Sequence, residues 1–185
     1  MNATRLLAAQ HRAIEALFDD VAHETRRQVR VRATSRLTEE LIAHMAAEET
    51  IFYPAARAAL GPTRGPGDAG GRLPDEHFML RVQLRRVLAT NLHTPAFAPR
   101  FEALRTLFAH HVQSEEEEIF PRVEAVFSAS RLEDLGAAVL GARPPIWIVT
   151  TETHAAALRS RGKRGQRDNR DQALRGVRLP SLTEN

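Results

Sequence analysis

The sequence contains no cysteine among its 185 residues, which excludes disulfides, thiolate metal sites and a cysteine nucleophile. It has a single tryptophan and a single tyrosine, and no run approaches the roughly 18 apolar residues of a membrane span. The first residues, MNATRLLAAQHRAIEALF, lack the apolar segment and cleavage site of a signal peptide. We therefore expect a cytoplasmic protein that makes no membrane contact.

Excess basic charge is confined to one end of the chain. The net charge is +3 and the pI is near 10.4. Residues 159–185 contain eight Lys or Arg and three Asp or Glu, a net charge of about +5, so residues 1–158 carry about −2. This tail has few large apolar residues, and we expect it to be disordered. Any contact with nucleic acid is expected through the tail alone.

Apolar residues recur at helical spacing in four segments separated by turn residues. The first spans roughly residues 3–27 and has Asn2 or Thr4 as its cap. After a basic connection over 26–32, a second helix is predicted to start near Thr34 or Ser35.

A Gly- and Pro-rich loop over 61–71 separates the first two helices from the last two. The third helix is predicted to have Pro74 in its first turn, and the fourth follows a linker over 94–99. Ser130 and Glu133 form a possible capping box for a short fifth helix. Four amphipathic helices with short links predict an all-α, antiparallel up-down four-helix bundle.

One motif occurs twice. His44 is followed four residues later by Glu48 and then, after a second acid and apolar residues, by Pro54. His111, Glu115 and Pro121 repeat the order, with Pro121 again ten residues after the histidine. Residues i and i+4 lie on one face of a helix, so each copy points an imidazole and a carboxylate in the same direction. Each proline removes a backbone hydrogen bond, which predicts a kink or a weakened turn.

Each predicted helix places one histidine in its apolar stripe, and the chain resembles a duplicated two-helix unit with a period of about 66 residues. A lone His-x-x-x-Glu is typically a solvated surface pair, and one histidine in an apolar stripe is typically a satisfied core residue. Burying four imidazoles and two carboxylates together without a cation is very unfavourable. We therefore predict a dimetal site whose six ligands are His11, His44, Glu48, His77, His111 and Glu115.

Imidazole and carboxylate ligands together suit iron, with manganese or zinc as substitutes. Glu15 and Arg81 lie four residues after His11 and His77, and they either pair near the site or are solvated. Tyr53 is either redox-active near the metal or a packing residue. No catalytic residue is assigned beyond the metal ligands.

These residues resemble the hemerythrin-like family, also called the HHE cation-binding domain, over about residues 5–125. The resemblance implies an up-down four-helix bundle with a non-haem di-iron centre. It also implies activities such as oxygen binding, oxygen or iron sensing, nitric oxide handling and peroxide removal. Oxygen carriers of the family have a second histidine one turn from the first on the third helix, where this chain has Leu73 and Arg81. That departure favours peroxide or redox chemistry, or sensing, over reversible oxygen carriage.

The sequence thus predicts a hemerythrin-like bundle over 1–127, a helix and packing segment over 128–158, and the basic tail over 159–185. The expected ligand is dioxygen, nitric oxide or peroxide at a site bridged by histidine and glutamate ligands, with a catalase-like reaction as the leading activity. The alternative is an iron or oxygen sensor without turnover. A structural bundle that holds zinc is a third reading.

Overall fold

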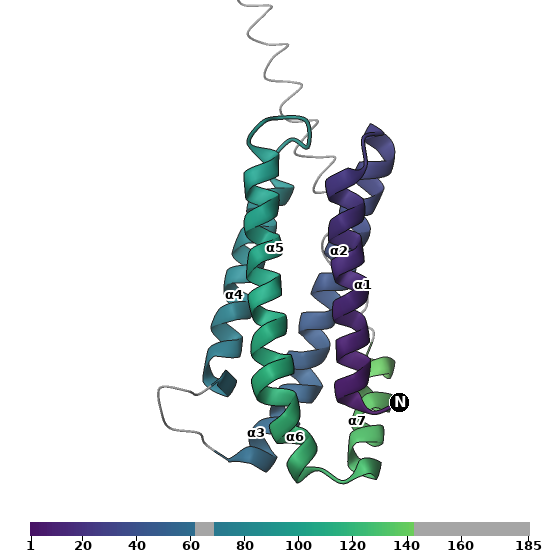
Figure 1. Ribbon diagram of the computed structural model, residues 1–185, viewed down its shortest axis with the longest axis vertical. Helices are drawn as coiled ribbons and strands as arrows, with labels where there is room; N and C mark the ends of the chain where they lie inside the picture. Colours follow the sequence, from purple (N-terminus) through teal and green to yellow (C-terminus); the bar gives the residue numbers. More distant parts are fainter. Residues whose placement is uncertain (62–68, 143–185) are drawn as a thin grey trace, which may run out of the picture. The chain divides into compact units, whose positions relative to one another are not determined.

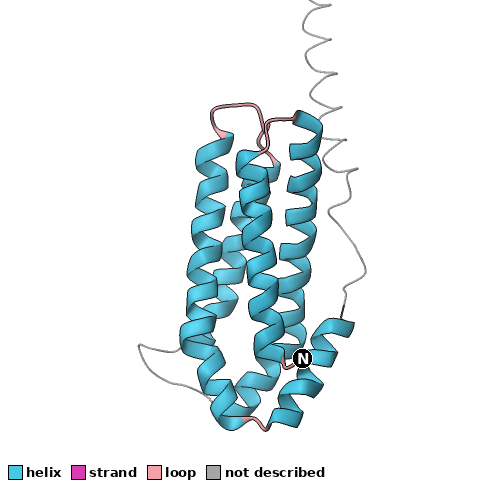
Figure 2. Cartoon of the chain, turned by 45° about the vertical axis from the view of Figure 1, so that its right-hand side comes forward, coloured by secondary structure: helices cyan, strands magenta, loops and turns pink. Residues whose placement is uncertain are grey.

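The computed structural model describes residues 1–61 and 69–142, and all secondary structure in these two ranges is helical (Figure 2). Helical segments follow one another along the chain: α1 (Ala3–His23), α2 (Arg27–Ala47), η1 (Glu48–Phe52), α3 (Tyr53–Leu60), α4 (Ala69–Leu88), α5 (Phe97–Gln113), η2 (Ser114–Ile119), α6 (Phe120–Val126) and α7 (Ala129–Gly141). The all-α prediction is confirmed. Within the described ranges, no helix combines the length and apolar character needed to cross a membrane.

The four long helices form the predicted up-down bundle (Figure 1). α1 packs on α2 and α4 packs on α5, each pair joined by a short turn, and α1 also touches α5. α7 packs on α1, so the helix expected after the bundle lies against its first helix. The predicted packing segment beyond residue 142 and the basic tail lie outside the described residues.

Helix α2 begins at Arg27, and the basic connection predicted over 26–32 is therefore wrong. The helix was predicted to start near Thr34 or Ser35, but the hydroxyls of these residues donate to the carbonyls of Arg30 and Val31, 2.8 and 3.2 Å away. This i−4 bonding is that of residues inside a helix. Arginine is a good helix former, so a run of arginines continues the helix rather than interrupting it.

The N-terminal boundaries of two other helices also differ from prediction. α4 begins at Ala69, so the loop predicted over 61–71 is shorter and Pro74 lies inside the helix. The proline removes only the bond to the carbonyl four residues earlier, and the helix continues past it. α7 begins with Ser128 as its cap, whose side chain accepts from the Arg131 N–H, so the capping box predicted at Ser130 is wrong. The cap predicted at Asn2 is confirmed, since its side chain accepts from the Arg5 N–H.

The two prolines of the repeated motif each follow a π-helical turn rather than a simple kink. The Tyr53 N–H bonds to the carbonyl of Glu48, and the Phe120 N–H bonds to that of Glu115, five residues back in both cases. Such a turn contains one extra residue and rotates all later side chains by about 100° relative to a continuous α-helix. Tyr53 and Phe120 become buried as a result.

The interior is divided into two apolar clusters. One includes Ile14, Met45 and Phe108, and the other includes Leu7 and Phe52. Along the chain, the first cluster gives way to the second within each copy of the repeated motif, between Met45 and Phe52 and between Val112 and Ile119. His11 and His77 also lie at such a boundary, since Leu7 and Leu73 belong to the second cluster and Ile14 and Leu80 to the first. The bundle therefore holds a polar layer between two apolar ones, which keeps the polar groups out of bulk water.

Candidate metal centre

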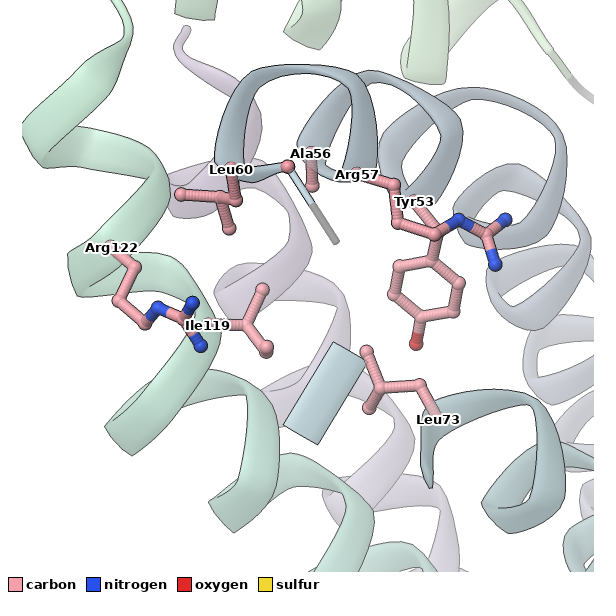
Figure 3. Close-up of a pocket in the computed structure, with 8 residues that line it drawn as sticks. Tyr53, Ala56, Arg57, Leu60, Leu73, Ile119 and Arg122 are labelled. Atoms are coloured by element: carbon pink, nitrogen blue, oxygen red, sulfur yellow. The ribbon is translucent and has the colours of Figure 1, made fainter. Parts of the chain in front are cut away.

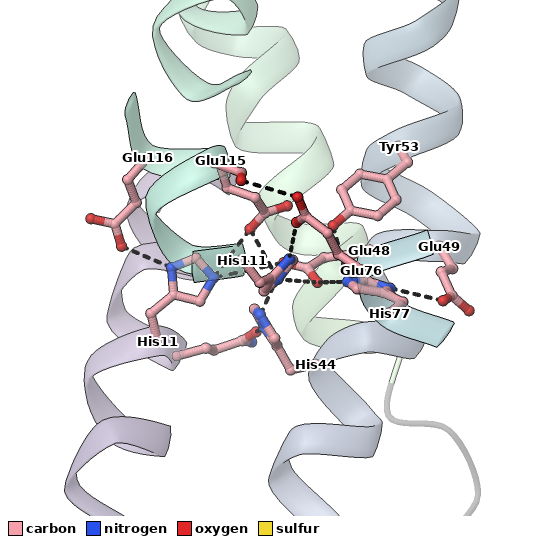
Figure 4. A network of polar contacts seen from close by, with 12 residues as sticks. His11, His44, Glu48, Glu49, Tyr53, Glu76, His77, His111, Glu115 and Glu116 are labelled. Atoms are coloured by element: carbon pink, nitrogen blue, oxygen red, sulfur yellow. Dashed lines mark hydrogen bonds and ion pairs between the residues drawn. The ribbon is translucent and has the colours of Figure 1, made fainter. Parts of the chain in front are cut away.

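The structure brings all six predicted ligand residues together in this polar layer (Figure 4). Each of the six residues is at most 3% exposed. Potential ligand atoms of five of them (His11, His44, Glu48, His111 and Glu115) lie within 4.8 Å of one another. His77 adjoins this group, with its Nε2 3.3 Å from Glu48 Oε2. α1, α2, α4 and α5 contribute one histidine each, and the two π turns contribute the glutamates.

The histidines form two pairs. The ring centroids of His11 and His44 are 4.7 Å apart, and those of His77 and His111 are also 4.7 Å apart. Between the pairs, the His11–His111 and His44–His111 distances are 6.0 and 6.1 Å. The first pair comes from the helices α1 and α2, and the second from α4 and α5. Each half of the duplicated unit thus supplies one pair.

Glu48 lies between the two pairs. Its Oε1 is 3.0 Å from His44 Nε2 and 3.9 Å from His11 Nε2. Its Oε2 is 3.3 Å from His77 Nε2 and 3.7 Å from His111 Nε2. Each carboxylate oxygen therefore faces a different histidine pair.

Glu115 makes a second link across the centre. Its Oε2 is 3.1 Å from His11 Nε2 and 3.7 Å from His111 Nε2. One oxygen of Glu115 is therefore within reach of both pairs. The two glutamates converge on the same space from η1 and η2, the π turns that directly follow α2 and α5.

The outer nitrogen of every histidine faces an acceptor on a different helix. His11 Nδ1 lies 2.8 Å from Glu116 Oε1, and His77 Nδ1 lies 2.8 Å from Glu49 Oε1. His44 Nδ1 lies 2.9 Å from Gln10 Oε1. His111 Nδ1 lies 3.4 Å from Glu76 Oε2. These contacts orient all four rings with Nε2 inward, the arrangement typical of metal-ligating histidines.

Two arginines hold the outer carboxylates. Arg81 donates two hydrogen bonds to Glu49, of 2.8 and 2.7 Å, and Arg12 donates to Glu116 at 2.5 Å. Arg81 therefore lies near the centre but faces Glu49 rather than the space between the histidines. Glu15 accepts from Arg12 at 3.3 Å and lies one contact further out.

Burial and mutual contact shift the proton affinities of the central groups. Burial lowers the pKa of His44 to about 3, and the nearby charge of Glu48 offsets this only in part. Burial also lowers the pKa of His11 and His111, but contacts with Glu115, Glu48 and Glu76 outweigh it and raise the values to about 9 and about 10.

The two glutamates are shifted in opposite directions. Burial raises the pKa of Glu48, but the surrounding histidines outweigh it and hold the pKa well below its ordinary value. Burial, together with the negative charge of Glu48, raises the pKa of Glu115. Without a metal ion, the centre therefore holds protons on His11 and His111 next to an ionised Glu48.

The inner atoms of the centre are left without hydrogen bonds. Within the described residues, His11 Nε2, His44 Nε2, His111 Nε2 and both oxygens of Glu48 and Glu115 are buried and have no hydrogen-bond partner. Buried polar groups are nearly always paired, and several orphaned lone pairs converging on one space fit a bound cation. The residues present therefore suit a metal with nitrogen and oxygen ligands, although coordination by each residue stays a prediction.

Tyr53 places a hydroxyl at the same centre. Its Oη lies 3.1 Å from His77 Nε2, and burial, together with the charges of Glu48 and Glu115, raises its pKa well above 10.0. The corresponding residue of the second half is Phe120, whose ring stacks on His11 with 6.0 Å between centroids. The duplicated unit thus has a phenol on one side and a phenyl ring on the other.

Sequence reasoning missed two of the four residues behind the histidines, Gln10 and Glu76. The signal was present in the repeat, because these two residues directly precede the histidines of α1 and α4. Glu49 and Glu116, which directly follow the two glutamates, were expected to be either surface acids or acids that support the ligands. Tyr53 was considered both as a redox group and as a packing residue, and its contact with His77 shows that it faces the centre.

Comparison with known proteins agrees with this architecture. The chain is 26% identical over 133 residues to a DNA nickase from Nostoc sp. (strain PCC 7120 / SAG 25.82 / UTEX 2576), and the match covers 72% of this chain. The chain spans only 36% of the length of that relative. A hemerythrin HHE cation-binding domain-containing protein from Mycobacterium kansasii has the same fold, with a TM-score of 0.71 and 23% identity over 86% of this chain and 99% of the other.

The family model for the hemerythrin HHE cation-binding domain matches residues 2–123. This range contains the four bundle helices, both π turns and all six residues of the polar layer. The chain therefore belongs to the hemerythrin HHE cation-binding domain family.

Proposed function

We propose that the chain holds two iron ions in this centre and uses them to handle peroxide or a related small oxygen or nitrogen ligand. One iron would be held by His11 and His44, the other by His77 and His111, with Glu48 and Glu115 between them. The position of Glu48 carries the proposal, because its two oxygens face different histidine pairs. A carboxylate so placed can contact two cations and lower the repulsion between them.

Iron is favoured over the alternatives by its chemistry rather than by raw affinity. Imidazole and carboxylate ligands suit iron, manganese and zinc, and zinc would provide no electrons. When bound, a pair of irons would supply two electrons that, with two protons, reduce one hydrogen peroxide to two waters. It would then take two electrons from a second peroxide, which is released as oxygen and two protons. Manganese could serve the same role, whereas zinc would make the centre structural.

The protein's own part in this chemistry is to exclude bulk water and to hold one proton, that of the Tyr53 hydroxyl, beside the centre. The apolar clusters on both sides of the polar layer keep bulk water away from it. Tyr53 stays protonated because of its raised pKa. A metal on His77 Nε2 would replace the present 3.1 Å contact and leave the phenol O–H to donate to a ligand in the same space.

A small cavity adjoins Tyr53 and suits a ligand of this size (Figure 3). Its volume is about 30 Å³ and its walls include Leu73, Ile119 and Leu60, with Arg57 and Arg122 also lining it. That volume suffices for a water-sized molecule. An oxygen carrier has an extra histidine one turn from the first on the third helix, and the positions one turn from His77 are Leu73 and Arg81. Leu73 is buried, and Arg81 is bound to Glu49. Neither supplies a further ligand, which favours an exchangeable position.

Oxygen evolution from hydrogen peroxide tests the proposal. Iron-loaded protein is compared with the Glu48→Ala variant and with free iron at equal concentration, after metal analysis of anaerobically purified protein. The proposal expects two irons per chain and a rate well above that of free iron, which Glu48→Ala abolishes. Two irons with a rate equal to free iron would leave sensing without turnover as the function. Zinc in place of iron would support the structural reading.

A second candidate is contact with nucleic acid through residues 159–185. Their charge of about +5 and the similarity to a protein named a DNA nickase favour it. Supercoiled plasmid incubated with the full chain, and with a chain ending at residue 158, separates binding from cleavage. Retardation of the plasmid that requires the tail would support binding through the tail. Cleavage by both chains would assign nuclease activity to the bundle. If neither retardation nor cleavage is seen, this candidate function is ruled out.

A further inference from the structure

The two halves of the centre have nearly the same surroundings, with one difference in charge. His11 faces Glu116, which is bound by Arg12. His77 faces Glu49, which is bound by Arg81. In each half, the carboxylate behind the histidine is bound by an arginine. Arg12 also contacts Glu15 at 3.3 Å, but the Glu15 side chain is 42% exposed and lies one contact further from the histidine. These two contacts therefore do not distinguish the halves.

The remaining two histidines are backed by different groups. His44 Nδ1 forms a 2.9 Å hydrogen bond with the neutral amide of Gln10. His111 Nδ1 instead lies 3.4 Å from the carboxylate of Glu76, an ion-pair contact rather than a hydrogen bond. Gln10 precedes His11, and Glu76 precedes His77, so the two residues occupy equivalent positions in the repeat. Ser114 donates to Glu76 at 3.1 Å and helps to keep it in place. Glu76 Oε1 also lies 3.7 Å from Nδ1 of the exposed His110.

From this asymmetry we infer that the two metal subsites are unequal, with His77 and His111 forming the tighter one and Glu76 as the residue that makes it so. The inference rests on the proposed dinuclear centre and concerns its order of loading. A carboxylate behind an imidazole raises the basicity of the ligating nitrogen, and its charge attracts the cation directly. An amide provides the hydrogen bond without the charge.

The subsite inferred to be weaker also lies beside the larger of two cavities near the centre. Gln10 and His44 line a cleft of about 260 Å³ between α1, α2 and the end of α7, together with Glu39 and Glu40. The cavity beside Tyr53, in contrast, measures about 30 Å³ and has mainly apolar walls. The subsite with the neutral backing therefore has the larger approach from outside, which suits the metal that enters last and leaves first.

The equivalent positions allow a test that preserves net charge. The double variant Gln10→Glu/Glu76→Gln exchanges the two backing groups. Metal-free protein is titrated with Zn²⁺ and followed by calorimetry and by NMR of the imidazole nitrogens. In the native chain, the first equivalent of Zn²⁺ should shift the NMR signals of His77 and His111, and the second equivalent should shift those of His11 and His44. The double variant should reverse this order.

Single variants set the size of the effect. Glu76→Gln should weaken the first binding step by about 10- to 100-fold, the range typical of residues that support metal ligands. Asp75→Asn is the matched control, because Asp75 is the exposed neighbour of Glu76 and its substitution removes one negative charge from the same helix. It should change the first step by less than a factor of two or so in the same titration. Circular dichroism verifies that each variant is folded.

The outcomes separate this inference from the proposed function. Fewer than two zinc ions at saturation in the native chain would contradict the dinuclear centre itself. Two ions that shift all four histidines together, or an order unchanged in the double variant, would overturn the role of Glu76 and leave the dinuclear centre standing.

Discussion

At the scale of single residues, Glu48 links the two halves of the centre more directly than any histidine. Each histidine belongs to one pair, whereas the oxygens of Glu48 lie 3.0 Å from His44 and 3.3 Å from His77. The side chain is fully buried and its pKa is held well below the ordinary value by the histidines around it. A loss at this position should therefore affect both subsites.

We expect Glu48→Gln to reduce metal affinity at both subsites, each by more than about 10-fold, because it removes an anionic oxygen donor from both. Glu49→Gln, one residue later, removes only the negative charge behind His77 and should weaken one subsite. Competition with a chromophoric chelator measures both steps. A Glu48→Gln protein that binds two equivalents as tightly as the native chain would contradict the bridging position.

We expect Tyr53→Phe to leave metal content unchanged and to slow peroxide turnover by about 10²-fold, the lower end for loss of a positioned proton donor. Phe120 occupies the equivalent position in the second half, so a phenyl ring is known to fit against the histidine layer. Oxygen evolution per bound iron is the measurement, with Phe120→Tyr as a companion variant. Equal rates for Tyr53→Phe and native protein would assign Tyr53 to packing.

At the scale of secondary structure, the two π turns determine which side chains face the polar layer. A continuous α-helix from His44 would bury position 55 on the same stripe as Glu48. With one residue inserted, Tyr53 and Ala56 are buried instead, and Ala55 is only partly buried. Pro54 follows directly, and because it has no backbone N–H it cannot form the ordinary α-helical hydrogen bond to the carbonyl of Thr50. Wide turns of this kind are frequent at functional sites.

Helix α7 depends on a close approach to the start of the chain. A Cβ added at Gly136 would lie 2.2 Å from the Met1 carbonyl oxygen and 3.1 Å from the Ala3 nitrogen. We expect Gly136→Ala to destabilise the fold by about 1–3 kcal/mol, because backbone must move to admit the methyl group. Gly141→Ala is the control, since nothing lies within 4 Å there and alanine favours the helix. Urea unfolding that ranks both variants equally would show that α7 is free to shift.

At the scale of the whole molecule, the metal-free bundle holds protons on two buried histidines, and a bound metal would displace these protons. The raised pKa values of His11 and His111, about 9 and about 10, mean that the metal-free centre binds protons the unfolded chain has lost. Groups of this kind stabilise the fold fully below the unfolded value of 6.5, and the stabilisation is lost as pH rises through the folded values. His44, with its pKa lowered to about 3, acts oppositely and destabilises the fold as pH falls below 6.5.

We therefore expect the Tm of metal-free protein to fall by more than about 5 °C between pH 6.5 and pH 10, which corresponds to one or two kcal/mol for a chain of this size. The zinc-loaded protein should not show this decline, because its histidines are already neutral and the affinity for metal rises with pH. Calorimetric scans of both forms provide the comparison. Parallel curves for the two forms would contradict protonation of the metal-free centre.

The sequence by itself was sufficient for the helical bundle and for the six residues of its polar layer. Helical periodicity depends on local spacing, and the histidines at matched positions of a duplicated unit identify one face of each helix. The boundaries at Arg27 and Ala69 were missed, because arginine runs and an internal proline are tolerated when the rest of a helix is held by packing.

What only the tertiary structure decided is how the residues around those six are shared between the two halves. The contacts of Gln10 with His44 and of Glu49 with His77 join different helices, and no local spacing specifies which acceptor meets which ring. The π turns likewise turn Tyr53 inward, because the register after Glu48 depends on how α3 packs against α6 rather than on the motif alone. The identity of the six polar-layer residues follows from local sequence, whereas their orientation and electrostatic surroundings follow from the packing of distant segments.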